Sequence, residues 1–180
     1  ADAAAPMTYY VDSVAGSNKQ SGHSPKEAWA NFTPVNGKTL KAGERLLIKR
    51  GSVINQELEV GARGTAEAWV EIGAYGEGTR PSIRRNWDIH ERCAYIRNPD
   101  YLRVSGLAFS DAGQGFVVRF RRPRHGNLLV EDCVAHHIEG IYREKGNLSG
   151  IPSWKDFKAP IGSIPRSGGI MVNGRSHDVT

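Results

Sequence analysis

The sequence predicts an all-β solenoid, in which short parallel strands coil around one core. Two stretches 26 residues apart repeat one pattern: Leu102–Phe109, aligned on Val104, and Leu128–Ala135, aligned on Val130. Val179 marks the start of a third copy. The apolar segments are short and are separated by Gly, Pro, Asn and Asp. This pattern and the 21 glycines are typical of short strands joined by turns. A period in the twenties is typical of solenoids.

Residues 1–44 are expected to form a strand, a loop and a capping helix. Tyr9–Val11 has the composition of a strand, and a polar loop follows. Pro25–Phe32 has the pattern of a short amphipathic helix, with Ser24 as N-cap and Pro25 in the first turn. Because the open end of a solenoid must be covered, we expect this helix to serve as its cap.

Residues 45–180 are expected to form the coils of the solenoid. Strands are predicted around Arg45–Lys49, Ile54–Val60 and Trp69–Tyr75. The interval from Val130 to Val179 is 49 residues, which is longer than one repeat. We therefore expect an insertion at about 143–167 that loops out of the stack, and such insertions often form the wall of a binding groove.

Composition limits the classes of partner. The net charge of +5 and the pI of about 9.4 favour a polyanion. No nucleic-acid motif accompanies the charge and no apolar run approaches the ~20 residues of a membrane span, so we expect neither nucleic acid nor a membrane as partner. Cys93 and Cys133 are 40 residues apart, which is not a whole number of repeats, and this predicts two unpaired core thiols.

The chain start, Ala1–Pro6, has the small residues left by signal-peptide cleavage, so we expect a secreted or periplasmic protein. At the other end, a parallel sheet that stops at Val179 would leave unpaired backbone groups. The expectation is that this chain is the N-terminal portion of a longer β-helix, completed after Thr180 by a second polypeptide.

Three segments carry a family resemblance: Tyr9–Trp29, Leu40–Gly51 and Gly64–Ile83. Together they resemble the secreted right-handed parallel β-helix (pectate-lyase-like) superfamily of carbohydrate-active enzymes. The resemblance implies a right-handed parallel β-helix that acts on polysaccharide. The superfamily includes lyases, hydrolases, epimerases and non-catalytic adhesins, so the reaction is left open.

An arginine cluster follows the first repeat and is the first candidate site. Arg119 and Arg121 are expected to point outward and Phe120 inward, because side chains alternate along a strand. With Arg122 they could bind uronate carboxylates in bidentate fashion, or they could form a solvated turn.

The second candidate site lies after the second repeat. We expect His137 to act as a base, with Tyr142, Arg143 and Lys145 as further catalytic residues. Glu144 and Trp154 are the predicted substrate-binding residues. Alternatively, the histidine is structural and the charged residues are merely solvated.

A lyase that cleaves an acidic, uronate-containing polysaccharide by β-elimination is the first functional hypothesis, because of the basic charge. The alternatives are a glycoside hydrolase of the same fold and a non-catalytic glycan-binding or adhesin segment. A hydrolase would need two carboxylates about 5–10 Å apart, for which Asp111 with Glu139 or Asp132 with Glu144 are candidates. No cofactor is expected; calcium is possible, although the sequence has no compact acidic motif.

Overall fold

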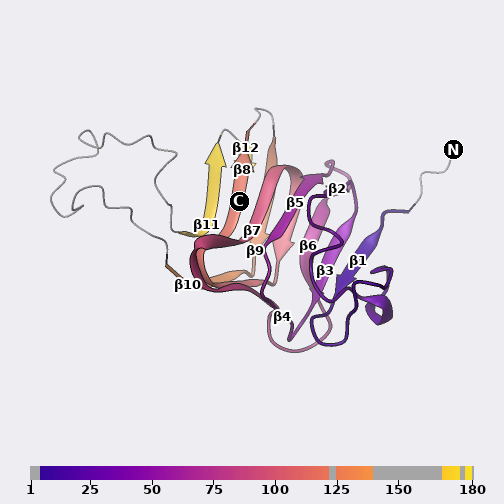
Figure 1. Cartoon of the computed structure of the whole chain (residues 1–180). Coiled ribbons are helices and arrows are strands. Elements are labelled where there is room, and N and C mark those ends of the chain that lie inside the picture. The colour runs from indigo at the N-terminus through magenta and orange to yellow at the C-terminus, as the bar shows by residue number, and fades with distance from the viewer. Residues whose placement is uncertain (1–4, 122–124, 140–167, 175–176, 180) are drawn as a thin grey trace.

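A computed structural model describes residues 5–121, 125–139, 168–174 and 177–179. The described residues form twelve β-strands and no α-helix, and the strands pair in parallel. Figure 1 shows them as one curled sheet around a common interior. The all-β class is therefore confirmed, and the curled parallel sheet is consistent with the predicted β-helix. Among the described residues, no helix is long and apolar enough to cross a membrane.

The sheet consists of three ladders, each a stack of parallel paired strands, and the chain passes through the three ladders in turn. The first ladder contains β1 (Thr8–Val11), β3 (Arg45–Lys49), β6 (Val70–Tyr75), the end of β7 (Ser82–Ser105), β9 (Gly126–Glu131) and β12 (His177–Val179). The second contains β4 (Val53–Ile54), the start of β7, the start of β8 (Ala108–Phe120) and β10 (Val134–Ile138). The third contains β2 (Thr39–Lys41), β5 (Leu58–Arg63), the middle of β7, the end of β8 and β11 (Gly168–Gly174).

The predicted repeat has the expected register in its first two copies. Val104 on β7 lies opposite Val130 on β9. The third copy is displaced by two residues, because Val179 lies opposite Leu128 instead. Side chains alternate with a period of two, so positions 128 and 130 lie on the same face of the strand and the apolar pattern fits either one.

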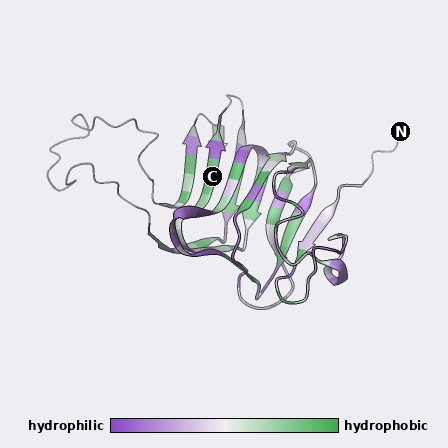
Figure 2. Cartoon of the chain, in the orientation of Figure 1, coloured by the Kyte–Doolittle hydropathy of each residue, from purple (hydrophilic) through white to green (hydrophobic). Residues whose placement is uncertain are grey.

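The core is formed by the side chains that point inward from all three ladders. The rings of Phe109 and Phe116 pack with centroids 5.5 Å apart, and both residues are buried. Figure 2 shows hydrophobic stretches continuing from strand to strand across the sheet. Cys93 is buried and Cys133 is half-buried, and neither is in a disulfide, as predicted.

The predicted capping helix is wrong. Only Pro25–Glu27 is helical, as one 3₁₀ turn called η1, and the Ser24 side chain does not cap it. The backbone of Trp29 instead bonds to β1: its N–H donates to the Tyr10 carbonyl at 2.9 Å, and its carbonyl accepts from the Asp12 N–H at 2.8 Å. This pairing draws the segment into an extended form, because the same groups cannot serve a helix.

The loop residues nevertheless complete the core at this end. Trp29 is 4% exposed, Phe32 and Val35 are fully buried, and the ring of Trp29 stacks on Tyr9 at 5.4 Å. The apolar residues that suggested a helix therefore do cover the core, but from an irregular loop.

The predicted insertion at about 143–167 lies outside the described residues, and the strands on either side show where the chain leaves the sheet. Ile138 on β10 lies opposite Ala112, and Gly168 on β11 lies opposite Gln114. In β8, Gly113 alone separates Ala112 from Gln114. In the next coil, residues 139–167 separate their partners, Ile138 and Gly168.

Candidate functional site at the corner between the second and third ladders

The coils bend between the second and third ladders at residues with left-handed backbone. Asp111 has φ 54° and His137 has φ 51°. One coil earlier the register shifts between Arg84 and Asp88, which places extra residues in this corner, and among them Trp87 has φ 65°. Such φ values are uncommon outside glycine and concentrate at functional sites. We call Trp87, Ser110, Asp111, His136 and His137 the His137 corner.

Asp111 and His137 are neighbours in adjacent coils. Ser110 pairs with His136 and Ala112 with Ile138, which places Asp111 beside His137. The Nδ1 atom of His137 lies 3.3 Å from Oδ1 of Asp111. The Ser110 hydroxyl donates to Oδ2 of the same carboxylate at 3.1 Å, so both carboxylate oxygens have a partner.

Two polar atoms lie close to Nδ1 of His137: Oδ1 of Asp111 at 3.3 Å and Nδ1 of His136 at 3.1 Å. The His137 side chain is 61% exposed, so a ligand can reach the imidazole ring beside the carboxylate.

Trp87 adds an aromatic surface to the corner. Its side chain is 54% exposed, and its ring lies 5.2 Å from that of His137 with a tilt of 33°. The segment of β7 that carries it has an ion pair between Arg85 and Glu91. An exposed indole beside an imidazole and a carboxylate offers both an apolar surface and polar partners to one ligand.

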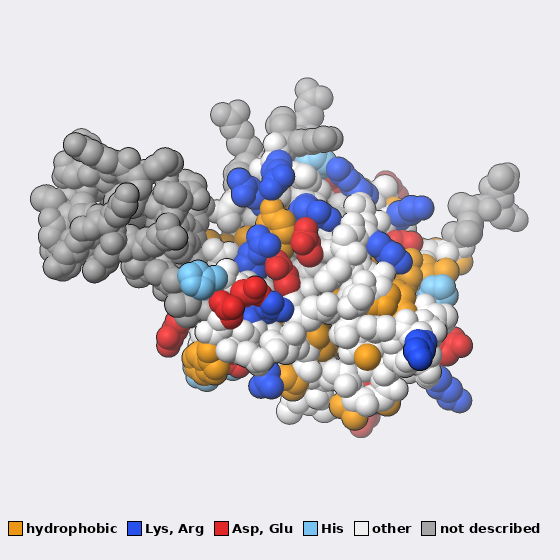
Figure 3. Space-filling model, viewed as in Figure 1, with side chains coloured by type: hydrophobic (Ala, Val, Ile, Leu, Met, Phe, Trp, Pro, Cys, Tyr) orange, Lys and Arg blue, Asp and Glu red, His pale blue; other side chains and the backbone are white. Residues whose placement is uncertain are grey.

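The predicted arginine cluster lies partly on the outer surface of the third ladder. Arg119 on β8 and Arg121 are exposed and Phe120 is buried, as the alternation predicted. Arg119 lies opposite Arg97 on β7, and Arg97 forms an ion pair with Glu59 at 3.0 Å. Figure 3 shows acidic and basic side chains together on this side of the molecule.

A second ion pair in the same row joins Arg92 to Glu57 at 2.7 Å. The Arg92 guanidinium also lies 4.0 Å from the centre of the Tyr95 ring. The row is therefore a mixture of paired charges rather than a uniformly basic strip.

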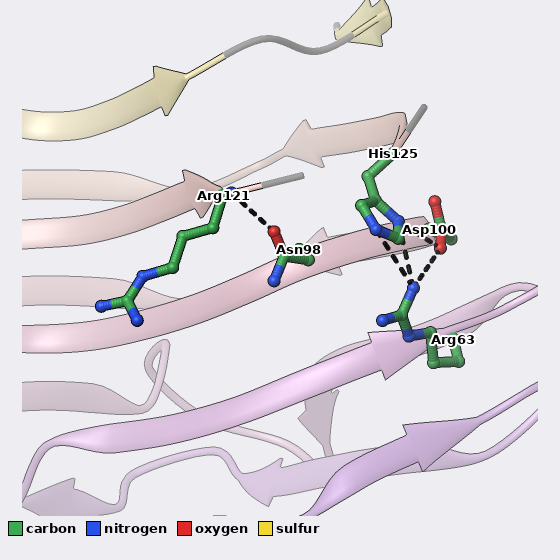
Figure 4. A network of polar contacts seen from close by, with 5 residues as sticks. All are labelled: Arg63, Asn98, Asp100, Arg121 and His125. Carbon is green, nitrogen blue, oxygen red and sulfur yellow. Dashed lines mark hydrogen bonds and ion pairs between the residues drawn. The ribbon is translucent and has the colours of Figure 1, made fainter. Parts of the chain in front are cut away.

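The end of the arginine cluster contributes to a different network (Figure 4). The backbone N–H of Arg121 donates to Oδ1 of Asn98 at 2.6 Å. Asp100 accepts from Arg63 at 2.9 Å and contacts Nδ1 of His125 at 2.7 Å. Figure 4 shows the guanidinium of Arg121 pointing away from this network, so Arg121 and His125 do not form one site.

The remaining predicted site residues lie outside the described residues: Arg122, Tyr142, Arg143, Glu144, Lys145 and Trp154. Their roles stay predictions. In the part of the chain that is described, no group of three or more His, Cys, Asp or Glu side chains could hold a metal ion.

The structure adds Trp87 and Ser110 to the predicted histidine and gives Asp111 a defined partner. One sequence signal could have found the main contact, since Asp111 and His137 are 26 residues apart, the length of the repeat. No comparable signal exists for Trp87, because the register shift that places it in the corner leaves no periodic trace.

No protein-family model matches the chain, and no curated protein matches it. Among solved structures, the chain is similar to a GH136 lacto-N-biosidase from Eubacterium ramulus, in both its selenomethionine derivative and its native form. The TM-scores are 0.65 and 0.64, each at 25% sequence identity over 74% of this chain. The chain spans 27% and 28% of the length of these two structures.

Proposed function

We propose that this protein is a carbohydrate-active enzyme, and specifically a glycoside hydrolase. The observation that carries the proposal is the exposed Trp87 ring over His137, with the hydrogen-bonded carboxylate of Asp111 beside it. One face of a pyranose ring consists largely of C–H groups, which pack on an indole, whereas its hydroxyls need polar partners. The similarity to a lacto-N-biosidase supports a hydrolase over the other classes of the superfamily.

Hydrolysis of a glycoside requires two carboxyl groups near the bond that is cleaved. One donates a proton to the leaving oxygen while the C–O bond breaks, and the other activates water or attacks the anomeric carbon. Asp111 and Glu139 are the candidate pair. The Glu139 N–H donates to the carbonyl of Ala112 at 2.9 Å, so Glu139 lies one coil away from the residue after Asp111. Adjacent strands are about 4.8 Å apart, which allows the required separation.

The lyase hypothesis has less support than the hydrolase alternative, which the similarity to a lacto-N-biosidase favours. A lyase for uronates needs unpaired cations to neutralise the substrate carboxylate. Arg119 and Arg121 are exposed, but Arg92 and Arg97 of the same ladder bind Glu57 and Glu59, so a uronate would also meet carboxylates of the protein.

One further element of the proposal, a right-handed β-helix of the pectate-lyase-like kind, comes from the sequence resemblance.

The activity test uses the complete protein with an oligosaccharide that ends in lacto-N-biose, and with pectate and alginate. We expect a released sugar from the first substrate, and no ultraviolet absorbance of an unsaturated uronate from the other two. Asp111→Asn and Glu139→Gln should each lower kcat at least 100-fold. Glu77→Gln, at an exposed carboxylate in the turn between β6 and β7, serves as the matched control. Unsaturated product would overturn the hydrolase proposal in favour of a lyase.

A further inference from the structure

Two aromatic side chains lie side by side on the outer surface of the first ladder. Val70 pairs with Leu102, which places Trp69 beside Tyr101 in the next coil. The two rings are 5.6 Å apart and nearly perpendicular, at 84°. Val70 is fully buried, so Trp69 before it points outward. Tyr101 has a left-handed backbone, with φ 48°, and its ring lies against the exposed Trp69. Trp69 is 37% exposed, although an indole of this size would be stabilised by burial.

Planar polar groups occupy the next outward positions along the same strands. Glu71 accepts from Arg45 at 2.7 Å, and Arg103 binds Glu131 at 2.6 Å through its Nε. Each pair is partly exposed and joins two neighbouring coils. Because each guanidinium is matched by a carboxylate, this part of the surface offers hydrogen-bond donors and acceptors without a net charge.

The outward position after these pairs has no side chain on β6. It is Gly73, which is buried: a Cβ there would meet the Ser105 hydroxyl at 3.4 Å, the Ser105 carbonyl at 3.5 Å and a Glu71 carboxylate oxygen at 3.6 Å. Ser105 and Glu71 therefore provide the polar groups at this position. Trp69 and Gly73 are four residues apart on an extended strand, which corresponds to about 13 Å.

We propose that this surface, made of Trp69, Glu71, Tyr101, Arg103 and Ser105, is a second carbohydrate-binding site that takes a neutral oligosaccharide. We call it the Trp69 surface. The indole would pack against the C–H face of one sugar residue, and the Glu and Arg groups would bond the hydroxyls of the next. The proposal rests on the proposed function in that the protein acts on glycans, and it adds a site on a different ladder from the His137 corner.

Backbone and side-chain contacts hold the segment that carries Tyr101. The Gly64 N–H donates to the carbonyl of Asp100 at 2.8 Å, and Asp100 directly precedes Tyr101. Arg63 and His125 both contact the Asp100 carboxylate (Figure 4). A rigid aromatic surface loses little conformational entropy when a ligand binds, which favours affinity.

The test uses the complete protein with Asp111→Asn, which should not hydrolyse the oligosaccharide that ends in lacto-N-biose, and measures its affinity for that sugar by isothermal titration calorimetry fitted to two sites. Trp69→Ala and Tyr101→Ala should each weaken binding about tenfold, while Trp69→Phe should keep part of the affinity because it keeps an aromatic face. Glu67→Ala, an exposed change in the preceding loop, is the matched control and should bind like the wild type. Circular dichroism establishes that each variant is folded.

A second readout separates this inference from the proposed function. Hydrolysis of the same oligosaccharide by the wild type tests the enzyme. If the wild type hydrolyses it and folded Trp69→Ala protein binds it with unchanged affinity, the second site is overturned and the hydrolase proposal stands. If the wild type does not hydrolyse it but Trp69→Ala weakens binding, the second site is supported and the hydrolase proposal fails. A wild type that neither binds nor hydrolyses the sugar overturns both.

Discussion

His137 lies one coil beyond Asp111, and its Nδ1 atom contacts the Asp111 carboxylate at 3.3 Å. Ser110 bonds the other oxygen of that carboxylate. The contact places the imidazole beside the carboxylate, and the His137 side chain is 61% exposed. This arrangement resembles the way in which many enzymes orient a histidine through a carboxylate.

Replacing His137 should reduce activity without unfolding the protein. We expect His137→Ala to lower kcat/KM on the lacto-N-biose-terminated substrate about 10- to 100-fold, because it removes a polar partner of the sugar and an orienting contact of Asp111. His137→Asn keeps a hydrogen-bond donor and should retain more activity. His23→Ala, at an exposed histidine near the N-terminus, is the control. Equal activity in His137→Ala and in the wild type would remove His137 from the site.

The ion pair between Asp12 and Lys49 should make stability depend on pH. Asp12 is 3% exposed, and its carboxylate bonds Lys49 at 2.7 Å. Burial by itself raises the pKa of Asp12, but the bonds from Lys49 and from the N–H groups of Val14 and Ala15 outweigh it, so the net pKa is below the ordinary 3.8. The group therefore stabilises the fold above about pH 4, and this contribution is lost as the pH falls through the lower, folded pKa.

Lys49→Met tests that contribution by urea denaturation at pH 7 and at pH 3. We expect a loss of about 1–3 kcal/mol at pH 7, because a buried carboxylate loses its partner, and a smaller loss at pH 3, where Asp12 begins to take up a proton. Lys19→Met, at an exposed lysine, should have no effect at either pH. A loss that is larger at pH 3 than at pH 7 would show that the pair does not act in this way.

The thiol of Cys93 should be unreactive in the folded protein. Burial raises the pKa of Cys93 to about 12, and its Sγ atom donates to the carbonyl of Ser110 at 3.4 Å. Burial also raises the pKa of Cys133. Since the thiolate is the reactive form, Ellman's reagent at pH 8 should label a Cys133→Ser variant only after denaturation. Rapid labelling of that variant without denaturant would contradict the burial of Cys93.

Phe109→Ala should cost stability because it leaves a cavity between the second and third ladders. Phe109 is fully buried and packs on Phe116, so we expect a loss of about 3–5 kcal/mol in the free energy of unfolding. Phe109→Leu should cost less, since it fills part of the space. Val14→Ala, at a residue that is 83% exposed, should change little. Chemical denaturation measures all three, and a loss below 1 kcal/mol for Phe109→Ala would contradict this packing.

The sequence predicted the stacked β-strands because inward positions recur at a fixed interval in adjacent coils, as Val104 and Val130 do. The alignment with Val130 was two positions away from the observed partner of Val179, which is Leu128. Alternation does not distinguish one inward position of a strand from the next inward position. The helix prediction failed for another reason. Local pattern and a Pro in the first turn favoured it, but the backbone of Trp29 is bonded to β1, a contact that no local signal contains.

The site was predicted less completely than the fold. His137 stood out because histidine is a common catalytic residue, and its contact with Asp111 follows from the repeat length. Trp87 reaches the same corner through a register shift in β7, and the sequence does not reveal where a solenoid coil widens. Arg119 and Arg121 were predicted to point outward, and both are exposed. The ion pairs that other outward arginines form with carboxylates about one coil away, such as Arg97 with Glu59, were not predicted.

Those partners have a consequence for how the coils assemble. Arg45 with Glu71, Glu59 with Arg97 and Arg103 with Glu131 each connect a coil to the next one in the stack. In the first ladder Arg45, Glu71 and Arg103 occupy paired positions in three successive coils, so the sign of the charge alternates there. A stack that omitted the middle coil would place Arg45 beside Arg103, two like charges. The ion pairs therefore favour the native order of the coils over other orders, even though each pair adds little to stability.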